Sequence, residues 1–338
     1  MYTDKMCHKI LELYSGIGGM HCAWTDSGLH GEIVAAVDIN TIANAVYKHN
    51  FPKIKLLNKN IQSLKIDDIK KMRIDTILMS PPCQPFTRNG NYLDDQDPRS
   101  NSFIYLIGIL EKLENVKYIL MENVKGFESS SVRGYFIKTL MKCQFDYQEF
   151  LLSPSSMGIP NSRLRYYCIA RRGDTPWNFK QKSEIMESLL VENGETSSLK
   201  DIIDTEIETE QFLVPEKLLK KANLLDICHP QSKRSCCFTK AYTHYVEGTG
   251  SVFTELDPET IKKLYENANK YPTGSVEFVN IIKELKLRFF TPREVLSLMS
   301  FPNSYSFPEN ITKKQCYRLL GNSLNVKVIS ELIKILYA

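Results

Sequence analysis

The sequence predicts an α/β fold with a mostly parallel sheet, and two observations support this prediction. Short apolar runs with polar ends recur at residues 8–16, 32–37, 75–80 and 117–121, and each is typical of a buried strand. Segments with helical spacing lie between them, including one at 103–113. Strands that alternate with helices in this way form a parallel sheet covered on both faces.

The polar residues at the strand ends explain where each predicted strand stops. The first strand runs into the glycine turn at 16–19, ahead of a predicted helix at 19–27, and the second is closed by Asp38. The helix that begins at Thr41 stops before Pro52. Ligands of such sheets sit at the carboxyl ends of the strands, which share one edge. The strand ends expected at that edge are Tyr14 to Gly19, Asp38, Ser80 to Phe86, and Glu122.

The regular alternation stops in the second half of the chain. Strand candidates at 145–152 and 165–170 are followed by short, irregular elements with basic and aromatic clusters. Helical spacing returns after Thr291, where Pro292 suits the first helical position, and the last amphipathic helix runs from Asn325 to Leu336. We therefore expect a first domain at 1–174, a smaller second domain at 175–290, and closing helices at 291–338 that return to the first domain.

Composition excludes several classes of protein. The 338 residues are 43% hydrophobic and 24% charged, as in ordinary globular proteins, and neither a membrane span nor a secretory signal is visible. The nine cysteines are scattered and form no Cys-x-x-Cys pair, which favours reduced thiols in the cytoplasm or nucleus and argues against a zinc site. A net charge of +4 is compatible with a polyanionic partner. Oligomeric state stays open, and a monomer is compatible with the sequence.

Cys83 lies in the loop Ser80-Pro81-Pro82-Cys83-Gln84-Pro85-Phe86. Prolines fix backbone angles and remove backbone donors, so this loop is expected to hold the thiol in a set direction. A strand end that presents one rigid cysteine is typical of a nucleophile site. The alternative is a buried cysteine that only fills space, as most free cysteines do.

The glycine turn Gly16-Ile17-Gly18-Gly19 suggests a nucleotide site without identifying the ligand. His21 stands where the dinucleotide-binding fingerprint has its last glycine, which argues against an NAD site. A glycine turn with an acid at the second strand end suits a nucleoside without pyrophosphate, such as S-adenosylmethionine, with Asp38 accepting from the ribose hydroxyls. The alternatives are a plain strand-to-helix turn and a capping role for Asp38.

Five motifs in chain order resemble the cytosine-5 methyltransferase family over nearly the whole chain. They are Glu12-Leu13-Tyr14-Ser15-Gly16-Ile17-Gly18-Gly19, Pro81-Pro82-Cys83-Gln84, Glu122-Asn123-Val124, Arg163-Leu164-Arg165 and Gly321-Asn322-Ser323. Three more stretches resemble one branch, the DNA-methyltransferase homologues that methylate transfer RNA. They are Cys237-Phe238-Thr239, Tyr245-Val246-Glu247-Gly248-Thr249-Gly250-Ser251 and Arg288-Phe289-Phe290-Thr291-Pro292-Arg293-Glu294.

The resemblance implies both a fold and a substrate. The fold is that of S-adenosylmethionine-dependent methyltransferases, a Rossmann-like and mostly parallel sheet with a smaller inserted target-recognition domain. The substrate is a cytosine of transfer RNA (tRNA), cytosine 38 in the anticodon loop of aspartate tRNA, and S-adenosylhomocysteine is the product. The same residues also suit a DNA cytosine-5 methyltransferase, and a catalytically silent nucleic-acid-binding homologue is a further alternative.

The resemblance also implies roles for individual residues. The Cys83 thiolate adds to carbon 6 of cytosine, Glu122 protonates ring N3, and Arg163 and Arg165 supply positive charge. Substrate contacts are expected from Gln84, Asn123, Cys237, Phe238 and Thr239. Cofactor contacts are expected from Tyr14, Gly16, Gly18, Gly19, Asp38, Ile39, Asn60, Ser80, Asn322, Ser323 and Val328. Taken singly, these charged side chains could equally face solvent, Cys237 could be structural, and Phe238 could belong to the core.

Two positions depart from the DNA-modifying relatives. Asn60 stands where those enzymes more often carry aspartate, although an amide oxygen can still accept from the adenine amine. Asn161-Ser162 precedes Arg163 where DNA enzymes often have Gln-Arg, which removes one positive charge near the substrate.

Overall fold

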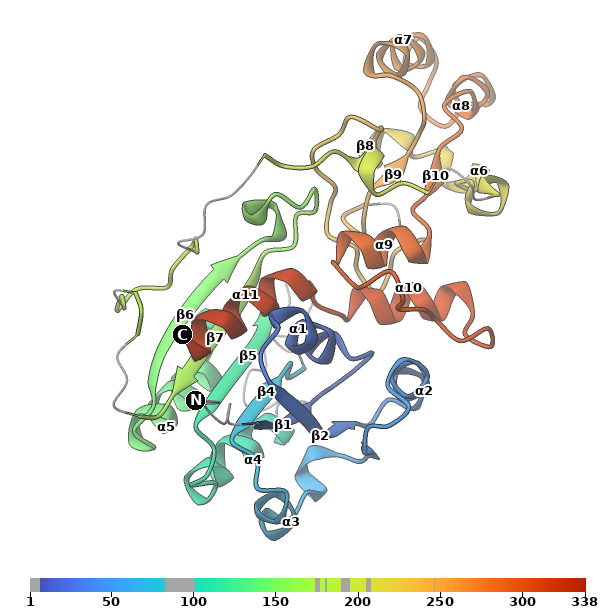
Figure 1. The fold of residues 1–338 in the computed structure, drawn as a ribbon. Coiled ribbons are helices and arrows are strands. Elements are labelled where there is room, and N and C mark those ends of the chain that lie inside the picture. The colour runs from blue at the N-terminus through green and yellow to red at the C-terminus, as the bar shows by residue number, and fades with distance from the viewer. Residues whose placement is uncertain are drawn as a thin grey trace, which may run out of the picture.

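A seven-stranded sheet forms the centre of the structure (Figure 1). The structure is a computed structural model and describes residues 7–82, 101–173, 177–179, 181–189, 195–204, 208–245 and 247–338. Its strands are β1 (His8–Leu13), β2 (Gly31–Asp38), β3 (Leu56–Asn58), β4 (Thr76–Met79), β5 (Tyr118–Val124), β6 (Asp146–Leu152) and β7 (Arg165–Arg171). They lie in the order β3-β2-β1-β4-β5-β7-β6. Strands β1 to β5 pair in parallel, and β7 pairs antiparallel with both β5 and β6.

Helices cover both faces of this sheet because successive strand residues point to opposite faces. Ile10 of β1 belongs to one apolar cluster, with α1 and α11, and its neighbour Leu11 belongs to another, with α4 and α5. The helices of this part of the chain are α1 (Gly19–Ser27), α2 (Thr41–Asn50), α3 (Ile66–Lys71), α4 (Asn101–Ile109), α5 (Ser131–Lys142) and α11 (Val326–Tyr337). The two clusters together form the core that fixes the strand ends.

A second group of elements lies at the upper end of the molecule in Figure 1. It contains a small sheet of β8 (Ile227–Cys228), β9 (Val252–Phe253) and β10 (Arg288–Phe289), in the order β10-β9-β8. The helices here are α6 (Glu216–Leu219), α7 (Pro258–Ala268) and α8 (Val276–Lys283), with α9 (Pro292–Leu298) and α10 (Lys313–Gly321) between this group and the large sheet. None of the described helices is long and apolar enough to cross a membrane.

The α/β class and the mostly parallel sheet predicted from the sequence are confirmed. The helix predicted at 19–27 has those bounds, and Thr291 caps α9 through its side chain, which accepts from the Glu294 N–H. The short strand β3 was missed because three residues carry too little periodicity to stand out. The antiparallel placement of β7 depends on long-range pairing, which no local pattern shows.

Candidate functional site

A large cavity lies at the carboxyl ends of β1, β2, β4 and β5. Its volume is about 2200 Å³, and its wall includes residues from the glycine turn, from the segment after α10 and from residues 237–249. The predicted site residues that line it are Tyr14, Gly16, Gly19, Asp38, Ile39, Asn60, Ser80, Glu122, Asn123, Arg163, Arg165, Cys237, Thr239, Asn322 and Ser323. The structure therefore brings most of the predicted residues to one place, although they come from distant parts of the chain.

The glycine turn forms one wall because its backbone adopts angles that suit glycine. Gly16 has φ +51° and Gly18 has φ +87°, both in the left-handed region. A Cβ on Gly16 would meet no atom within 4 Å, so the space beside this residue is open. A Cβ on Gly18 would lie 2.6 Å from the Phe51 ring, so this glycine packs away from the cavity. The turn is thus open at Gly16 and tightly packed at Gly18.

Asp38 at the end of β2 fixes the shape of the turn. One carboxylate oxygen accepts from the Gly16 N–H at 2.8 Å, and the other accepts from the Asn40 N–H at 2.7 Å. Burial raises the pKa of Asp38, and these backbone donors oppose that shift. The next side chain, Ile39, lines the cavity and is 66% exposed. An acceptor next to an exposed apolar surface suits a ribose and its attached base.

Asn60 and Tyr14 complete this part of the wall. The Asn60 side-chain oxygen accepts from the Gln62 N–H at 3.0 Å, which leaves it one further lone pair. The Tyr14 hydroxyl donates to Ser102 Oγ at 3.1 Å, and burial raises the pKa of Tyr14. The residues present thus fit an S-adenosylmethionine molecule, whose ribose would meet Asp38 and whose adenine would meet Ile39 and Asn60.

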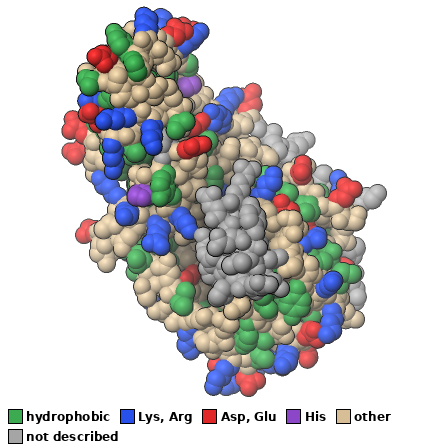
Figure 2. Space-filling view, turned by 180° about the vertical axis from the view of Figure 1, so that it is seen from behind, with side chains coloured by type: hydrophobic (Ala, Val, Ile, Leu, Met, Phe, Trp, Pro, Cys, Tyr) green, Lys and Arg blue, Asp and Glu red, His purple; other side chains and the backbone are tan. Residues whose placement is uncertain are grey.

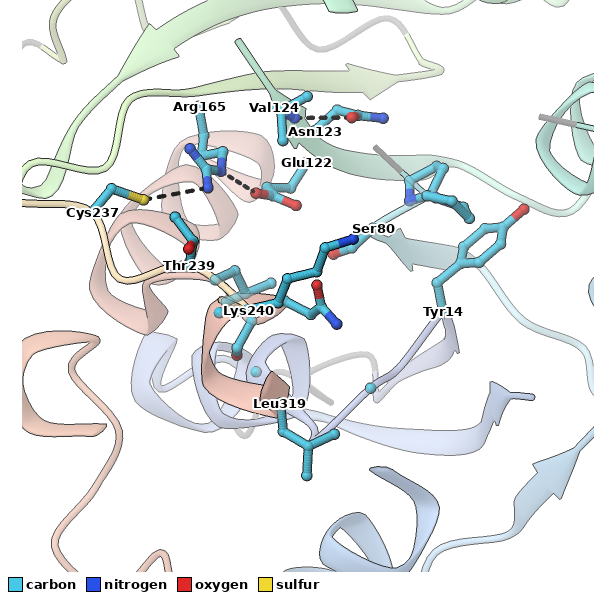
Figure 3. A pocket seen from close by; sticks show the side chains of 18 of the residues that line it. Tyr14, Ser80, Glu122, Asn123, Val124, Arg165, Cys237, Thr239, Lys240 and Leu319 are labelled. Atoms are coloured by element: carbon cyan, nitrogen blue, oxygen red, sulfur yellow. Dashed lines mark hydrogen bonds and ion pairs between the residues drawn. The ribbon is translucent and has the colours of Figure 1, made fainter. Parts of the chain in front are cut away.

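Glu122, Arg165 and Cys237 form a charged cluster (Figure 3). It lines the same cavity as Tyr14, Asp38, Ile39 and Asn60, which we call the cofactor wall. Arg165 Nε lies 3.6 Å from Glu122 Oε1, and Arg165 Nη2 lies 3.7 Å from Cys237 Sγ. Burial raises the pKa of Glu122, although Arg165 and Arg163 partly oppose it. Burial also acts to raise the pKa of Cys237, but the two arginines outweigh it and the net shift is downward. The cluster can therefore offer a protonated carboxyl next to a fixed positive charge.

Arg163 is a clamp between two backbone segments. Its guanidinium donates to Phe238 O at 3.1 Å and to Gly321 O at 3.2 Å, and it also contacts Cys237 Sγ at 3.4 Å and the carbonyl of Ser323. The side chain is buried, at 3% exposure. Through these contacts Arg163 holds the two walls together, and its predicted role as a source of positive charge stays a prediction.

Gly321 allows these two segments to touch. A Cβ at this position would lie 2.0 Å from Lys240 N and 2.2 Å from the Thr239 carbonyl carbon. Only a residue without a side chain can accept that approach. The Gly321-Asn322-Ser323 motif therefore has a packing reason as well as a place on the cofactor wall.

The predicted substrate contact at Phe238 is wrong. Phe238 is 1% exposed, and its ring packs edge-on against Tyr242 at 4.9 Å and Phe290 at 5.3 Å. A ring enclosed by other side chains has no free face for a base. Its apolar character, which suggested stacking in the sequence, belongs to the core.

Other predicted residues lie at the border of the site or outside it. Val328 is fully buried in α11, and its N–H donates to Asn325 Oδ1 at 3.1 Å, so it lies away from the cavity wall. Asn123 Oδ1 accepts from the Val124 N–H, which fixes the loop after β5. Cys83 and Gln84 lie outside the described residues, but Ser80 to Pro82 line the cavity directly before them in the chain.

Several lining residues were not predicted. They include five lysines, namely Lys59, Lys125, Lys217, Lys221 and Lys240, together with Tyr245. Lys240 follows the Cys237-Phe238-Thr239 motif directly and Tyr245 begins the next motif, so both stood beside a sequence signal. Lys217 and Lys221, on and just after α6, carried none. Figure 2 shows Lys and Arg side chains gathered where the α6–α8 part meets the large sheet.

Comparison with known proteins gives consistent matches over the whole length. A family model described as C-5 cytosine-specific DNA methylase matches residues 8–338. A Spodoptera frugiperda protein named tRNA (cytosine(38)-C(5))-methyltransferase is 66% identical over 332 residues, covering 98% of this chain and 100% of that protein. A Dictyostelium discoideum protein named DNA (cytosine-5)-methyltransferase is 38% identical and covers 97% of this chain and 94% of its own length. The crystal structure of a Spodoptera frugiperda DNMT2 mutant has a TM-score of 0.92 at 65% identity, covering 98% of this chain and 100% of that chain.

Proposed function

The chain belongs to the C-5 cytosine-specific DNA methylase family, and from that premise we propose that it methylates carbon 5 of a cytosine in tRNA. The proposed target is cytosine 38 in the anticodon loop of aspartate tRNA. The position is supported by the name of the 66% identical relative, and the aspartate tRNA by the resemblance of residues 237–239 and 245–251. The observation that carries the chemistry is the Glu122–Arg165 pair beside the cofactor wall.

Cytosine carbon 5 is too weak a nucleophile to react unaided, and we assign its activation to Cys83. Addition of the thiolate to carbon 6 breaks the C5–C6 double bond and gives an enamine-like ring, with electron density at carbon 5. Ser80, Pro81 and Pro82 line the cavity just before Cys83, which supports this assignment. A free cysteine has a pKa of about 8.5, so nearby positive charge favours the thiolate.

Glu122 is assigned as the proton donor to ring N3. Burial raises its pKa, which favours the protonated carboxyl that can donate. Arg165 Nε lies 3.6 Å from this carboxyl, and we assign Arg165 to hold the base carbonyl. Proton transfer to N3 neutralises the charge that thiolate addition creates. Once carbon 5 carries the methyl group, loss of its proton to solvent and departure of the thiolate restore the aromatic ring, and return of the N3 proton to Glu122 frees the enzyme.

S-adenosylmethionine supplies the methyl group when it is bound. Asp38, Ile39 and Asn60 would hold its nucleoside, and Ser323 and Asn322 would close the opposite wall. We also propose that residues 1–174 are the catalytic domain, that residues 175–290 recognise the target, and that residues 291–338 return to the catalytic domain. The packing of α11 beside α1 on the large sheet supports the last point.

The test is methyl transfer from tritiated S-adenosylmethionine to a tRNA-Asp transcript, followed by bisulfite mapping of 5-methylcytosine. We expect label at cytosine 38 and none in a transcript with uridine at that position. Cys83→Ala is expected to abolish transfer, while the control Cys143→Ala, at the end of α5, keeps it. Full activity of Cys83→Ala would overturn the thiolate mechanism.

DNA methylation is the second candidate because the Dictyostelium discoideum relative is named for it. A duplex DNA arm in the same assay separates the two candidates. An unpaired loop base costs less to extrude than a paired base, so we expect the tRNA to be labelled far more strongly. Label on DNA with none on tRNA would reverse the proposal, and label on neither would favour a catalytically silent binding protein.

A further inference from the structure

Tyr245 presents an aromatic ring at the mouth of the cavity. It lines the cavity and is 62% exposed, whereas Glu122 in the same cavity is only 8% exposed. Phe238, which the sequence suggested as a stacking ring, is buried. Within the described wall of the cavity, Tyr245 is the aromatic residue with the most open face. Glu122 is assigned to the target cytosine and is buried, so the exposed Tyr245 ring is available to a different base.

The backbone that carries Tyr245 is held firmly, although the ring itself is free. The Tyr245 N–H donates to Ala241 O at 3.2 Å, and the Tyr245 carbonyl accepts from the Thr249 hydroxyl at 2.9 Å. The Thr249 carbonyl in turn accepts from the Thr239 N–H at 2.9 Å. The His244 and Tyr245 ring centroids lie 4.6 Å apart with the ring planes at 74°, and Tyr245 stays 62% exposed beside this contact. A ring on a fixed backbone loses little conformational entropy when a ligand stacks on it.

Lysine side chains line the same cavity as this ring. Lys217, Lys221 and Lys240 line the same cavity, and within the described part of the chain none of them forms an ion pair. Unpaired lysines that share a cavity with an exposed aromatic ring are a combination that binds single-stranded nucleic acid, because lysines meet phosphates and a ring stacks on a base.

We propose that Tyr245 stacks on an unpaired base of the substrate loop other than the target cytosine, while Lys217, Lys221 and Lys240 contact the neighbouring phosphates. This inference rests on the proposed function and adds a second recognition point to it. In a duplex, both faces of each base are covered by its neighbours, so a protein ring gains little there. In an RNA loop an unstacked base offers a free face. Tyr245 therefore selects a loop over a duplex.

The experiment compares Tyr245→Ala, Tyr245→Leu and Tyr245→Phe with the wild-type protein on the tRNA-Asp transcript. Tyr271→Ala is the matched control, since Tyr271 is 43% exposed and lies outside the cavity wall. In parallel, 2-aminopurine replaces each unpaired loop base except the target, and its fluorescence reports stacking directly. Melting temperature and S-adenosylmethionine binding show that each variant is folded.

We expect Tyr245→Ala and Tyr245→Leu to raise KM for tRNA by about 5- to 150-fold, which corresponds to roughly 1–3 kcal/mol per stacked base. Their kcat at saturating tRNA and the behaviour of Tyr245→Phe and Tyr271→Ala should stay close to wild type. At one or more loop positions the wild-type protein should quench 2-aminopurine and Tyr245→Ala should not. Unchanged KM and quenching in folded Tyr245→Ala would overturn the inference alone. Absence of tRNA methylation by the wild-type protein would instead overturn the proposed function.

Discussion

Replacing the buried Glu12 with glutamine tests how burial controls the protonation of this carboxyl, which lies in the strand before the glycine turn. Glu12 lies in β1 and is fully buried, and its Oε2 accepts from the Tyr47 hydroxyl at 2.7 Å. Burial raises the pKa of Glu12 from 4.5 to about 8, opposed by smaller contributions from Tyr47 and from backbone amides at the start of α1. The folded protein therefore keeps a neutral carboxyl at this place at neutral pH.

The sign of the effect on stability follows from this shift. The folded-state pKa is higher than the unfolded one, so the folded chain binds the Glu12 proton more tightly. The contribution of Glu12 to the free energy of unfolding of the wild-type protein is therefore largest below about pH 4.5 and falls as the pH rises toward 8. One pKa unit corresponds to about 1.4 kcal/mol, so the loss between pH 5.5 and 8.5 is about 3 kcal/mol. Glu12→Gln cannot ionise and should not show this loss.

The assay is urea unfolding of both proteins at several pH values between 5.5 and 8.5. Other titrating groups cancel in the difference, so the stability of Glu12→Gln relative to wild type should rise by about 3 kcal/mol across this range. Glu259→Gln on the exposed face of α7 is the control, because water solvates this carboxylate in the folded and unfolded chain alike. Parallel pH curves for wild type and Glu12→Gln would refute the reasoning.

Further predictions concern the site and the core beside it. A lysine at position 163 cannot supply the donors with which Arg163 joins the two cavity walls, so the free energy of unfolding of Arg163→Lys should fall by about 3–6 kcal/mol. Unchanged stability in urea would show that these hydrogen bonds are unimportant. Phe238→Ala should cost about 3–5 kcal/mol of stability as a core truncation, whereas lost tRNA affinity at full stability would restore the stacking role. Glu122→Gln should lower kcat by about 10²- to 10⁴-fold with unchanged S-adenosylmethionine affinity. Wild-type activity should fall as the pH rises through the raised pKa of Glu122, and a flat profile would argue against a proton donor there.

Local sequence determined the fold class, and the resemblance to the methyltransferase family supplied the expected chemistry of the site. Strand and helix periodicity, together with the polar ends of the strands, placed Gly16, Asp38 and Glu122 at one sheet edge, and the structure finds them along one cavity. These features could be predicted because they depend on side-chain spacing and on the rule that parallel strands end at one edge. Cys83 stays a prediction, since it lies outside the described residues.

Only the tertiary structure decided which side chains are buried and which stay exposed. Arg163 and Arg165 alternate along one short stretch, yet long-range contacts make Arg163 a buried clamp and leave Arg165 beside Glu122. Phe238 and Tyr245 are both aromatic residues of neighbouring motifs, and packing buries the first and exposes the second. Burial and hydrogen-bond partners depend on segments that are far apart in the chain, so no local pattern distinguishes a core ring from a binding ring.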